Sequence, residues 1–135
     1  MSRPRHQGPR ALSPLELEIM TVVWNLGECT SGEVIAEYQK SRPLANTTIR
    51  TVLSNIRKKG YLDVVPSVEP RIRFRAKVTR ESVARRSIKQ LLSNLFQGSP
   101  REAIRILLQE ENIDAKDLAE IRRLIDEYDN GGDSR

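Results

Sequence analysis

Hydroxyl side chains and cations recur at helical spacing between Leu44 and Gly60. The set is Thr47, Arg50, Thr51, Ser54 and Lys58. Hydroxyl and guanidinium groups are suited to hydrogen bonding with base edges in the major groove of DNA. No Asp or Glu lies between Lys40 and Gly60, so no carboxylate would repel phosphate there. An ordinary amphipathic helix with a chance run of polar residues gives the same pattern, and both interpretations stay open on this stretch alone.

The same stretch predicts one helix with an apolar side. The apolar residues recur at helical period and are Ile49, Val52, Leu53 and Ile56. Lys58 and Lys59 suit the negative end of the helix dipole. Gly60 stands where a C-terminal cap is expected.

Two shorter helices are predicted ahead of this one. Segments 13–16 and 30–33 both have the capping-box pattern, a Ser or Thr followed three residues later by Glu. They open helices that end near Gly27 and Tyr38. Cys29 falls in the turn between the two helices and is expected to be a semi-buried, unreactive thiol.

A β-hairpin is predicted after the third helix. Segment 61–65 is rich in strand formers, 66–70 is turn material, and 71–78 alternates strictly between apolar residues and cations. The alternation predicts a buried face of Ile72, Phe74, Ala76 and Val78. The exposed face is wholly cationic, with Arg71, Arg73, Arg75 and Lys77, which repel one another unless an anion lies opposite. Three helices and this hairpin predict a winged helix-turn-helix domain over residues 12–78, with the wing on the DNA backbone.

Three further helices are predicted over residues 79–128, giving a mainly helical fold with a small antiparallel hairpin. The first helix spans 80–96, the second opens with a capping box at 99–102, and the third follows Asp114, before a frayed tail at 129–135. Helices this short bury little among themselves, so a homodimer would bury their surplus Leu and Ile. A small bundle packed on the winged helix is the alternative. The predicted dimerisation residues are Ile88, Leu91, Leu92, Leu95, Phe96, Ile104, Leu107, Leu108, Leu118, Ile121, Leu124 and Ile125.

Charge is distributed unevenly along the chain. Residues 1–80 hold 14 Lys and Arg against 7 Asp and Glu, whereas residues 81–135 hold 9 against 11. A basic first part joined to a slightly acidic second part indicates a polyanion-binding module and a separate partner-binding module. Residues 1–11 are predicted to be a disordered basic tail, which either lies along phosphates or in a minor groove or has no role.

One cysteine and one histidine limit the chemistry that the chain can perform. They exclude an internal disulfide, a thiolate metal cluster and His-based catalytic triads, and no Gly-rich phosphate loop is present. We therefore expect no enzyme, no catalytic residue, no metal and no cofactor. No apolar run approaches the ~20 residues needed to span a bilayer, and the start has no hydrophobic secretion segment. No membrane insertion and a cytoplasmic location are expected.

Four short motifs occur in order along the chain. They are LSPLELEIM at 12–20 followed by Val23-Trp24, TTIRTVL at 47–53, KKGYL at 58–62 and VTRE at 78–81. The ordered set, from about Leu12 to Tyr128, resembles the penicillinase-repressor family of bacterial regulators, the BlaI/MecI type. The resemblance implies a winged helix, a helical dimerisation domain and repression by a homodimer on a palindromic DNA operator. Carried over by position, it adds Asn46 and Thr48 to the predicted DNA contacts, which become Asn46, Thr47, Thr48, Arg50, Thr51, Ser54, Lys58, Arg71, Arg73 and Arg75.

The sequence departs from the family at two places. The best-known members are inactivated when a membrane-bound sensor peptidase cuts an Asn-Phe bond, and Ile106-Leu107 stand at the matching positions here. That peptidase is therefore a partner by resemblance only. A copper-responsive branch uses paired C-terminal cysteines, which are absent. The competing interpretation is a winged-helix module that contacts proteins and does not bind DNA; operator, regulated genes and inducing signal stay open.

Overall fold

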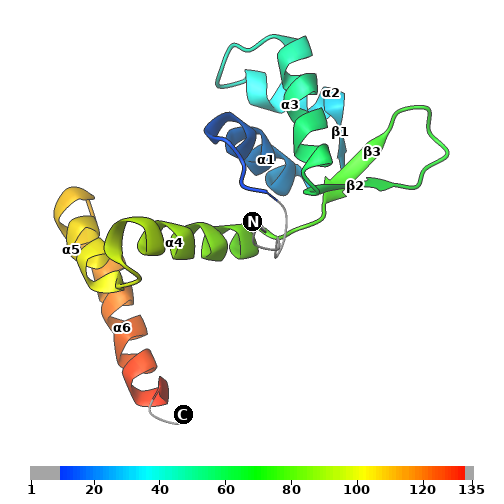
Figure 1. The fold of residues 1–135 in the computed structure, drawn as a ribbon. Coiled ribbons are helices and arrows are strands. Elements are labelled where there is room, and N and C mark those ends of the chain that lie inside the picture. Colours follow the sequence, from blue (N-terminus) through cyan, green and yellow to red (C-terminus); the bar gives the residue numbers. More distant parts are fainter. Residues whose placement is uncertain (1–9, 133–135) are drawn as a thin grey trace, which may run out of the picture. The chain divides into compact units, whose positions relative to one another are not determined.

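The computed structural model describes residues 10–132, so almost all of the predicted N-terminal tail lies outside the described part of the chain. The described residues form six helices and three short strands (Figure 1). In chain order the elements are α1 (Pro14–Leu26), β1 (Cys29–Thr30), α2 (Ser31–Gln39), α3 (Asn46–Lys58), β2 (Leu62–Val65), β3 (Arg73–Ala76), α4 (Arg80–Phe96), α5 (Pro100–Glu110) and α6 (Ala115–Gly132). The predicted fold class, a winged helix followed by three helices, is confirmed.

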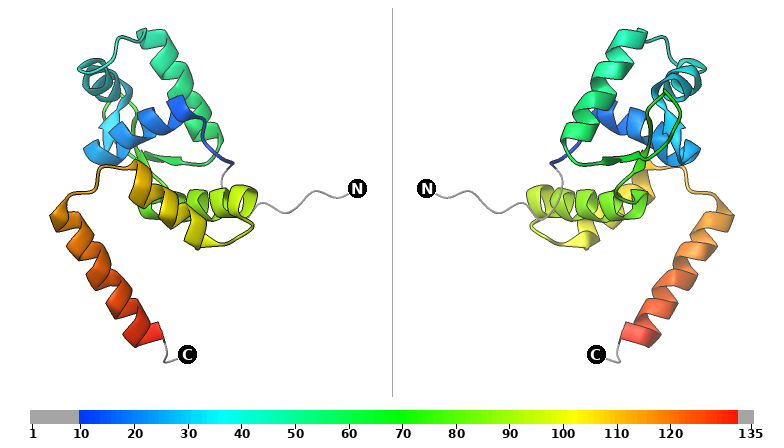
Figure 2. Two further views of the ribbon diagram at one scale, coloured as in Figure 1. Left: turned by 90° about the vertical axis from the view of Figure 1, so that its left-hand side faces the viewer. Right: turned by 90° about the vertical axis from the view of Figure 1, so that its right-hand side faces the viewer.

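The chain divides into two compact units, here called the head unit (up to Arg86) and the C-terminal unit (from Ser87). The boundary falls inside α4, whereas the sequence predicted it after residue 78. In the head unit, α1, α2 and α3 pack against one another beside the sheet (Figure 2). The buried apolar residues are Ile19, Met20, Val23, Cys29, Val34, Ile35, Tyr38, Ile49, Val52, Leu53, Ile56, Tyr61, Leu62 and Phe74.

The sheet is antiparallel, with strand order β1-β3-β2. The predicted hairpin is therefore present, but it gains a third strand that the sequence did not predict. In β1, Cys29 pairs with Phe74 and Thr30 pairs with Arg73. Thr30 is extended because it is the N-cap of α2, and this conformation suits a strand as well as a cap.

The third strand is shorter than the predicted segment 71–78. The ladder between β2 and β3 ends where Val65 pairs with Arg73, and Pro66 has no N–H with which to continue it. Ile72, predicted to be buried, is 61% exposed because it lies beyond the last pair. Val78 is half-buried, and its carbonyl accepts a hydrogen bond from the Trp24 indole at 2.9 Å.

The helix starts follow their capping residues in three of four predicted cases. Both capping boxes in the head unit are formed, at 13–16 and at 30–33. Asp114 also caps α6 as predicted, by accepting from the Asp117 N–H at 2.8 Å. The box predicted at 99–102 is wrong, since the Ser99 side chain makes no cap bond and Glu102 instead accepts from Arg105 at 2.6 and 2.9 Å. Arg80 to Phe96 is helical as predicted.

The last helix is longer than predicted. The sequence placed a frayed tail from 129 onward, but α6 continues through Gly132, and residues 133–135 lie outside the described part. Within residues 10–132, no helix is both long and apolar enough to cross a membrane.

The C-terminal end of α3 is closed by a Schellman motif. Gly60 has a positive φ of 93°, which a residue with a Cβ rarely adopts. The Gly60 N–H donates to the Arg57 carbonyl at 2.9 Å, and the Tyr61 N–H donates to the Ile56 carbonyl at 3.2 Å. Tyr61 is 3% exposed, so this cap also brings the chain directly into the core. The cap predicted at Gly60 is confirmed.

An ion pair joins this end of α3 to the start of α1. Lys59 Nζ lies 2.6 Å from Glu16 Oε1, and both side chains are largely buried. Burial acts to raise the pKa of Glu16, but the hydrogen bonds from Lys59 and from Ser13 outweigh it, and the pKa falls below 4.5. Lys59 also donates to the Ala11 carbonyl at 3.1 Å, so the described start of the chain is held to α3.

We predict that Glu16→Gln lowers the free energy of unfolding by about 1–3 kcal/mol at neutral pH, because the charged acceptor of the Lys59 and Ser13 hydrogen bonds becomes a neutral and weaker one. A carboxylate with a lowered folded-state pKa stabilises fully above its unfolded pKa of 4.5, and this contribution disappears as the pH falls through the folded value. The difference between wild type and Glu16→Gln should therefore shrink below about pH 4.5. Urea unfolding at several pH values measures it.

The matched control is Glu81→Gln, which breaks the exposed i,i+4 pair with Arg85. Solvent screens such a pair, so this variant should unfold like the wild type at every pH. A pH-independent loss in Glu16→Gln would contradict the assignment of the effect to the charge.

Candidate nucleic-acid interface

One side of α3 is buried in the core, and the opposite side faces solvent. Ile49 and Ile56 are fully buried, and Val52 and Leu53 are at most 8% exposed. The side chains that the sequence singled out on the opposite face are all exposed: Thr47, Arg50, Thr51, Ser54 and Lys58. Of the two residues added by resemblance, Asn46 is exposed and Thr48 is half-buried. The structure therefore brings six of the seven predicted α3 residues to the solvent-facing side of one helix.

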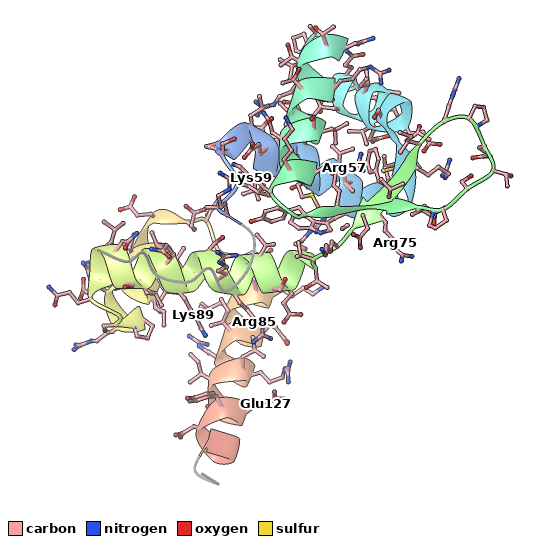
Figure 3. The ribbon with its side chains drawn as sticks, turned by 45° about the vertical axis from the view of Figure 1, so that its right-hand side comes forward. Arg57, Lys59, Arg75, Arg85, Lys89 and Glu127 are labelled. Atoms are coloured by element: carbon pink, nitrogen blue, oxygen red, sulfur yellow. The ribbon has the colours of Figure 1, made fainter. Side chains whose placement is uncertain are left out.

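The cations on this face have no carboxylate partner. Neither Arg50 nor Lys58 forms an ion pair with any residue between 10 and 132, and α3 itself contains no acid. Arg57 is also exposed and without an ion pair in the described chain (Figure 3), although the sequence patterns did not single it out. It lies seven residues, about two helical turns, after Arg50 and therefore on the same side of the helix. The seven-residue spacing from Arg50 is the sequence signal that would have placed Arg57 on this face.

The N-terminal turn of α3 is uncapped by any side chain. Ala45 is the N-cap and makes no side-chain hydrogen bond, in contrast to the N-caps of α1 and α2. The first backbone N–H groups of a helix point along the axis with no partner inside the helix. Together with the positive end of the helix dipole, they suit a phosphate.

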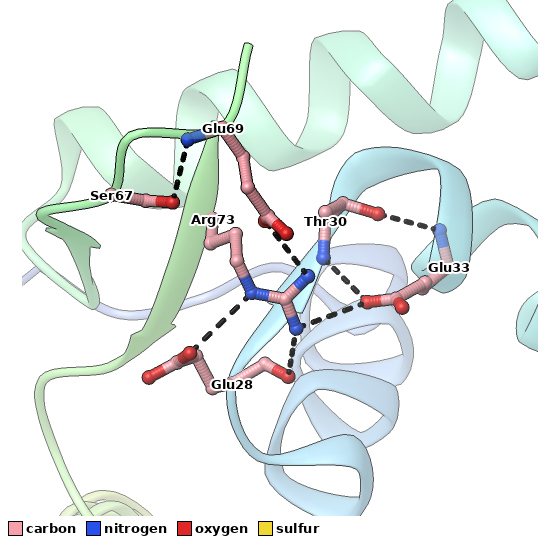
Figure 4. Close-up of polar contacts among 6 residues, drawn as sticks. All are labelled: Glu28, Thr30, Glu33, Ser67, Glu69 and Arg73. Atoms are coloured by element: carbon pink, nitrogen blue, oxygen red, sulfur yellow. Dashed lines mark hydrogen bonds and ion pairs between the residues drawn. The ribbon is translucent and has the colours of Figure 1, made fainter. Parts of the chain in front are cut away.

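Arg73 does not lie on a freely exposed cationic face, contrary to the sequence prediction. Its side chain is only 26% exposed and lies among three acids (Figure 4). Nε is 3.4 Å from Glu28 Oε1, Nη2 is 3.8 Å from Glu33 Oε1, and Nη1 is 3.9 Å from Glu69 Oε1. Nη2 also donates to the Glu28 carbonyl at 3.3 Å. Arg73 was predicted on the exposed cationic face of the hairpin, but its side chain is only partly exposed and the anions opposite it are three acids of this chain.

The other cations of the wing are exposed, as the sequence predicted. Arg71, Arg75 and Lys77 are exposed, and none forms an ion pair with the residues that the structure describes. Arg75 projects from β3 into solvent (Figure 3). The segment between the strands also presents Val68, which is fully exposed, and Glu69, which turns back to Arg73. The acid nearest the end of the wing therefore neutralises a structural arginine.

Cys29 is more deeply placed than the predicted semi-buried turn residue. It lies in β1 and is 1% exposed. Burial raises the pKa of its thiol to about 11, with a further rise from Glu33 and an opposing effect of Arg73. The thiol is therefore protonated at neutral pH. No three His, Cys, Asp or Glu side chains in the described chain gather in a way that could hold a metal ion.

The predicted dimerisation residues lie on three helices that bury no side chain completely between residues 87 and 131. Four of them are partly buried: Leu92, Phe96, Leu118 and Ile121. The other eight are between 47% and 69% exposed: Ile88, Leu91, Leu95, Ile104, Leu107, Leu108, Leu124 and Ile125. The Ile106-Leu107 pair lies inside α5, and both side chains are exposed.

Three packed helices, a short sheet and an outward-facing third helix define a winged-helix protein. The model of the penicillinase repressor family matches residues 12–127, and the chain belongs to that family, which is a family of transcriptional repressors. The resemblance drawn from the sequence motifs is confirmed.

Relatives of established name share between a fifth and a quarter of their residues with this chain. The penicillinase repressor of Staphylococcus aureus is 21% identical over 116 residues, covering 86% of this chain and 91% of the relative. The methicillin resistance regulatory protein MecI of Mammaliicoccus sciuri is 20% identical, covering 84% and 92%. The penicillinase repressor of Bacillus licheniformis is 23% identical, covering 88% and 92%. The similarity therefore spans both units.

We predict that Arg73→Met lowers the free energy of unfolding by about 1–2 kcal/mol, because the variant leaves Glu28, Glu33 and Glu69 without their shared cation. Arg75→Met, the matched change on an unpaired neighbour, should stay within about 0.5 kcal/mol of wild type. Urea unfolding of the three proteins gives the comparison. Equal values for the two variants would show that the acids around Arg73 do not stabilise the wing.

Proposed function

We propose that the chain represses transcription by binding an operator duplex as a homodimer, with α3 in the major groove and the wing on the DNA backbone. The observation that carries the proposal is the exposed, acid-free face of α3. On it, Arg50, Arg57 and Lys58 have no counter-charge among residues 10–132. Unneutralised cations beside short hydroxyl side chains are suited to a surface that meets both phosphates and base edges.

The roles of the side chains follow from their places on the head unit. Arg50 donates to a guanine edge, and Thr47 and Thr51 supply hydrogen bonds and contacts to thymine methyl groups. The free N–H groups at the start of α3 bind a phosphate. On the wing, Arg71 and Arg75 contact the backbone, whereas Arg73 holds the wing to Glu28 and Glu33 and so positions its neighbours.

Homodimerisation is proposed for the C-terminal unit on the strength of its exposed apolar side chains. Leu95, Ile125 and Tyr128 are 69%, 59% and 70% exposed. Isolated soluble units rarely leave so many large apolar side chains in water, and a second copy of the same helices would cover them. A dimer also supplies two recognition helices, which matches the two-fold symmetry of a palindromic operator.

We predict that Arg50→Ala and Arg75→Ala weaken DNA binding in different ways. Arg50→Ala should cost about 1–3 kcal/mol on a selected duplex and relax base preference, because a base contact is lost. Arg75→Ala should weaken selected and scrambled duplexes alike and reduce the slope of log affinity against log salt by about one. Gel shifts at several salt concentrations measure both quantities.

Lys116→Ala is the matched control, since it removes an exposed cation from α6. It should change neither base preference nor the salt slope. Equal losses of Arg50→Ala on both duplexes would reassign Arg50 to the backbone. If the wild type showed no salt-dependent binding to any duplex but formed a stable complex with another protein, the protein-contact interpretation would replace the proposal.

We predict that Ile125→Glu converts the dimer to monomers and makes the C-terminal unit unstable, because a buried carboxylate without a partner is costly. Sedimentation equilibrium gives the mass, and the midpoint of thermal unfolding should depend on protein concentration only for the wild type. Lys116→Glu introduces the same side chain on the polar side of α6 and should remain dimeric. A monomeric wild type at all concentrations would refute the dimer.

A further inference from the structure

The start of α3 is held by a side chain from the preceding helix. Gln39, the last residue of α2, donates from Nε2 to the Leu44 carbonyl at 2.7 Å and to Asn46 Oδ1 at 2.6 Å. Asn46 is the first residue of α3, and its N-cap Ala45 offers no side-chain hydrogen bond. Gln39 was not among the sequence-derived site residues, because no spacing rule connects the end of one helix to the start of another.

These two hydrogen bonds determine which way the amide of Asn46 faces. A backbone carbonyl only accepts, so the end of the Gln39 side chain that faces Leu44 must be its NH₂ group. The second hydrogen of that NH₂ group points at Asn46, which must therefore present Oδ1. The Nδ2 group of Asn46, with two hydrogens, lies at the other end of the amide and makes no hydrogen bond with the described chain.

We propose that Gln39 is a specificity-determining residue of the DNA site, acting by turning Asn46 so that a donor faces the groove. The inference rests on the proposed function, in which α3 lies in the major groove. Asn46 precedes Arg50 by four residues, so the two side chains are neighbours on the helix surface and meet neighbouring bases. Gln39 itself is a positioning residue, since it acts through Asn46.

The chemistry of the donor selects the base. Free asparagine prefers adenine, because its oxygen accepts from N6 while its nitrogen donates to N7. That bidentate contact needs both ends of the amide to face the base, and the hydrogen bond from Gln39 turns the oxygen of Asn46 toward the end of α2. A pair of donors instead suits guanine, which offers O6 and N7, or thymine, which offers O4. Cytosine presents a donor at N4 and is disfavoured. Asn46 therefore selects a keto base.

The test begins with wild-type protein and a library of duplexes that has a randomised centre, from which the preferred half-site is selected. Asn46→Ala identifies the base pair that Asn46 contacts, as the position where selectivity disappears. Dissociation constants are then compared for duplexes that differ only at that base pair. Guanine or thymine should be favoured over adenine by about ten-fold in the wild type.

Three variants separate orientation from a general structural effect. Gln39→Met has similar length but no donor, so the preference over adenine should fall to about two-fold or less. Gln39→Lys keeps a donor for both acceptors and should restore the ten-fold ratio, whatever its added charge does to absolute affinity. Asn46→Asp keeps the acceptor for Gln39 but faces the groove with an acceptor, and should prefer cytosine. Lys40→Met alters the neighbouring exposed side chain, which pairs with Glu37, and should leave the ratio unchanged.

Adenine preference in the wild type, or an unchanged ratio in folded Gln39→Met, would overturn the inference while leaving DNA binding intact. If Gln39→Met failed to fold, the wild-type preference would decide between the two outcomes, because an asparagine that Gln39 does not orient prefers adenine. Failure of the wild type to select any duplex would overturn the proposed function and the inference with it. Selection of a keto base, its loss in Gln39→Met and its return in Gln39→Lys would support the inference.

Discussion

The head unit depends on the burial of one side of its third helix. Ile49 and Ile56 are completely removed from water, and Val52 and Leu53 nearly so. These residues occupy an arc of roughly 100°. Turning α3 by a third of a revolution would expose that arc and bury a cation without a partner, which is far more costly than any surface rearrangement. The helix therefore has one allowed rotation, and the Schellman motif at Gly60 determines where it stops. The outward polar face is a consequence of this packing.

Sequence patterns predicted those features whose partners lie within one helical turn. The boxes at 13–16 and 30–33 formed because donor and acceptor are three residues apart. Even this rule failed at Ser99, because Glu102 accepts a hydrogen bond from Arg105 of the same helix and does not close the capping box. Patterns could not predict contacts made between distant segments. Arg73 meets a carboxylate 45 residues earlier in the chain, and Gln39 reaches across a turn whose geometry no propensity describes. Strand β1 was missed because two residues have no detectable period.

The arginines that the sequence placed on the recognition helix and the wing differ in a way that a count of charges does not show. Arg73 is neutralised by acids from three segments and belongs to the architecture. Arg50, Arg57 and Arg75 have no such partners in the described chain. The two units therefore differ in the kind of unpaired surface that they carry. The head unit carries cations without a counter-charge, whereas the C-terminal unit carries apolar side chains without a cover. In the proposed function, an anionic polymer meets the cations of the head unit, and a second copy of the chain covers the apolar side chains of the C-terminal unit.

The position of Cys29 has a practical consequence for work on this protein. The sole thiol of the chain lies in the middle of the core, with its pKa raised to about 11. Alkylating reagents can reach it only when the head unit opens, so its rate of modification reports that opening directly. In the closed state, a cysteine introduced at an exposed position would be the one reactive attachment point. A fluorophore or spin label can then be placed on the wing or on α6 without first replacing the native residue.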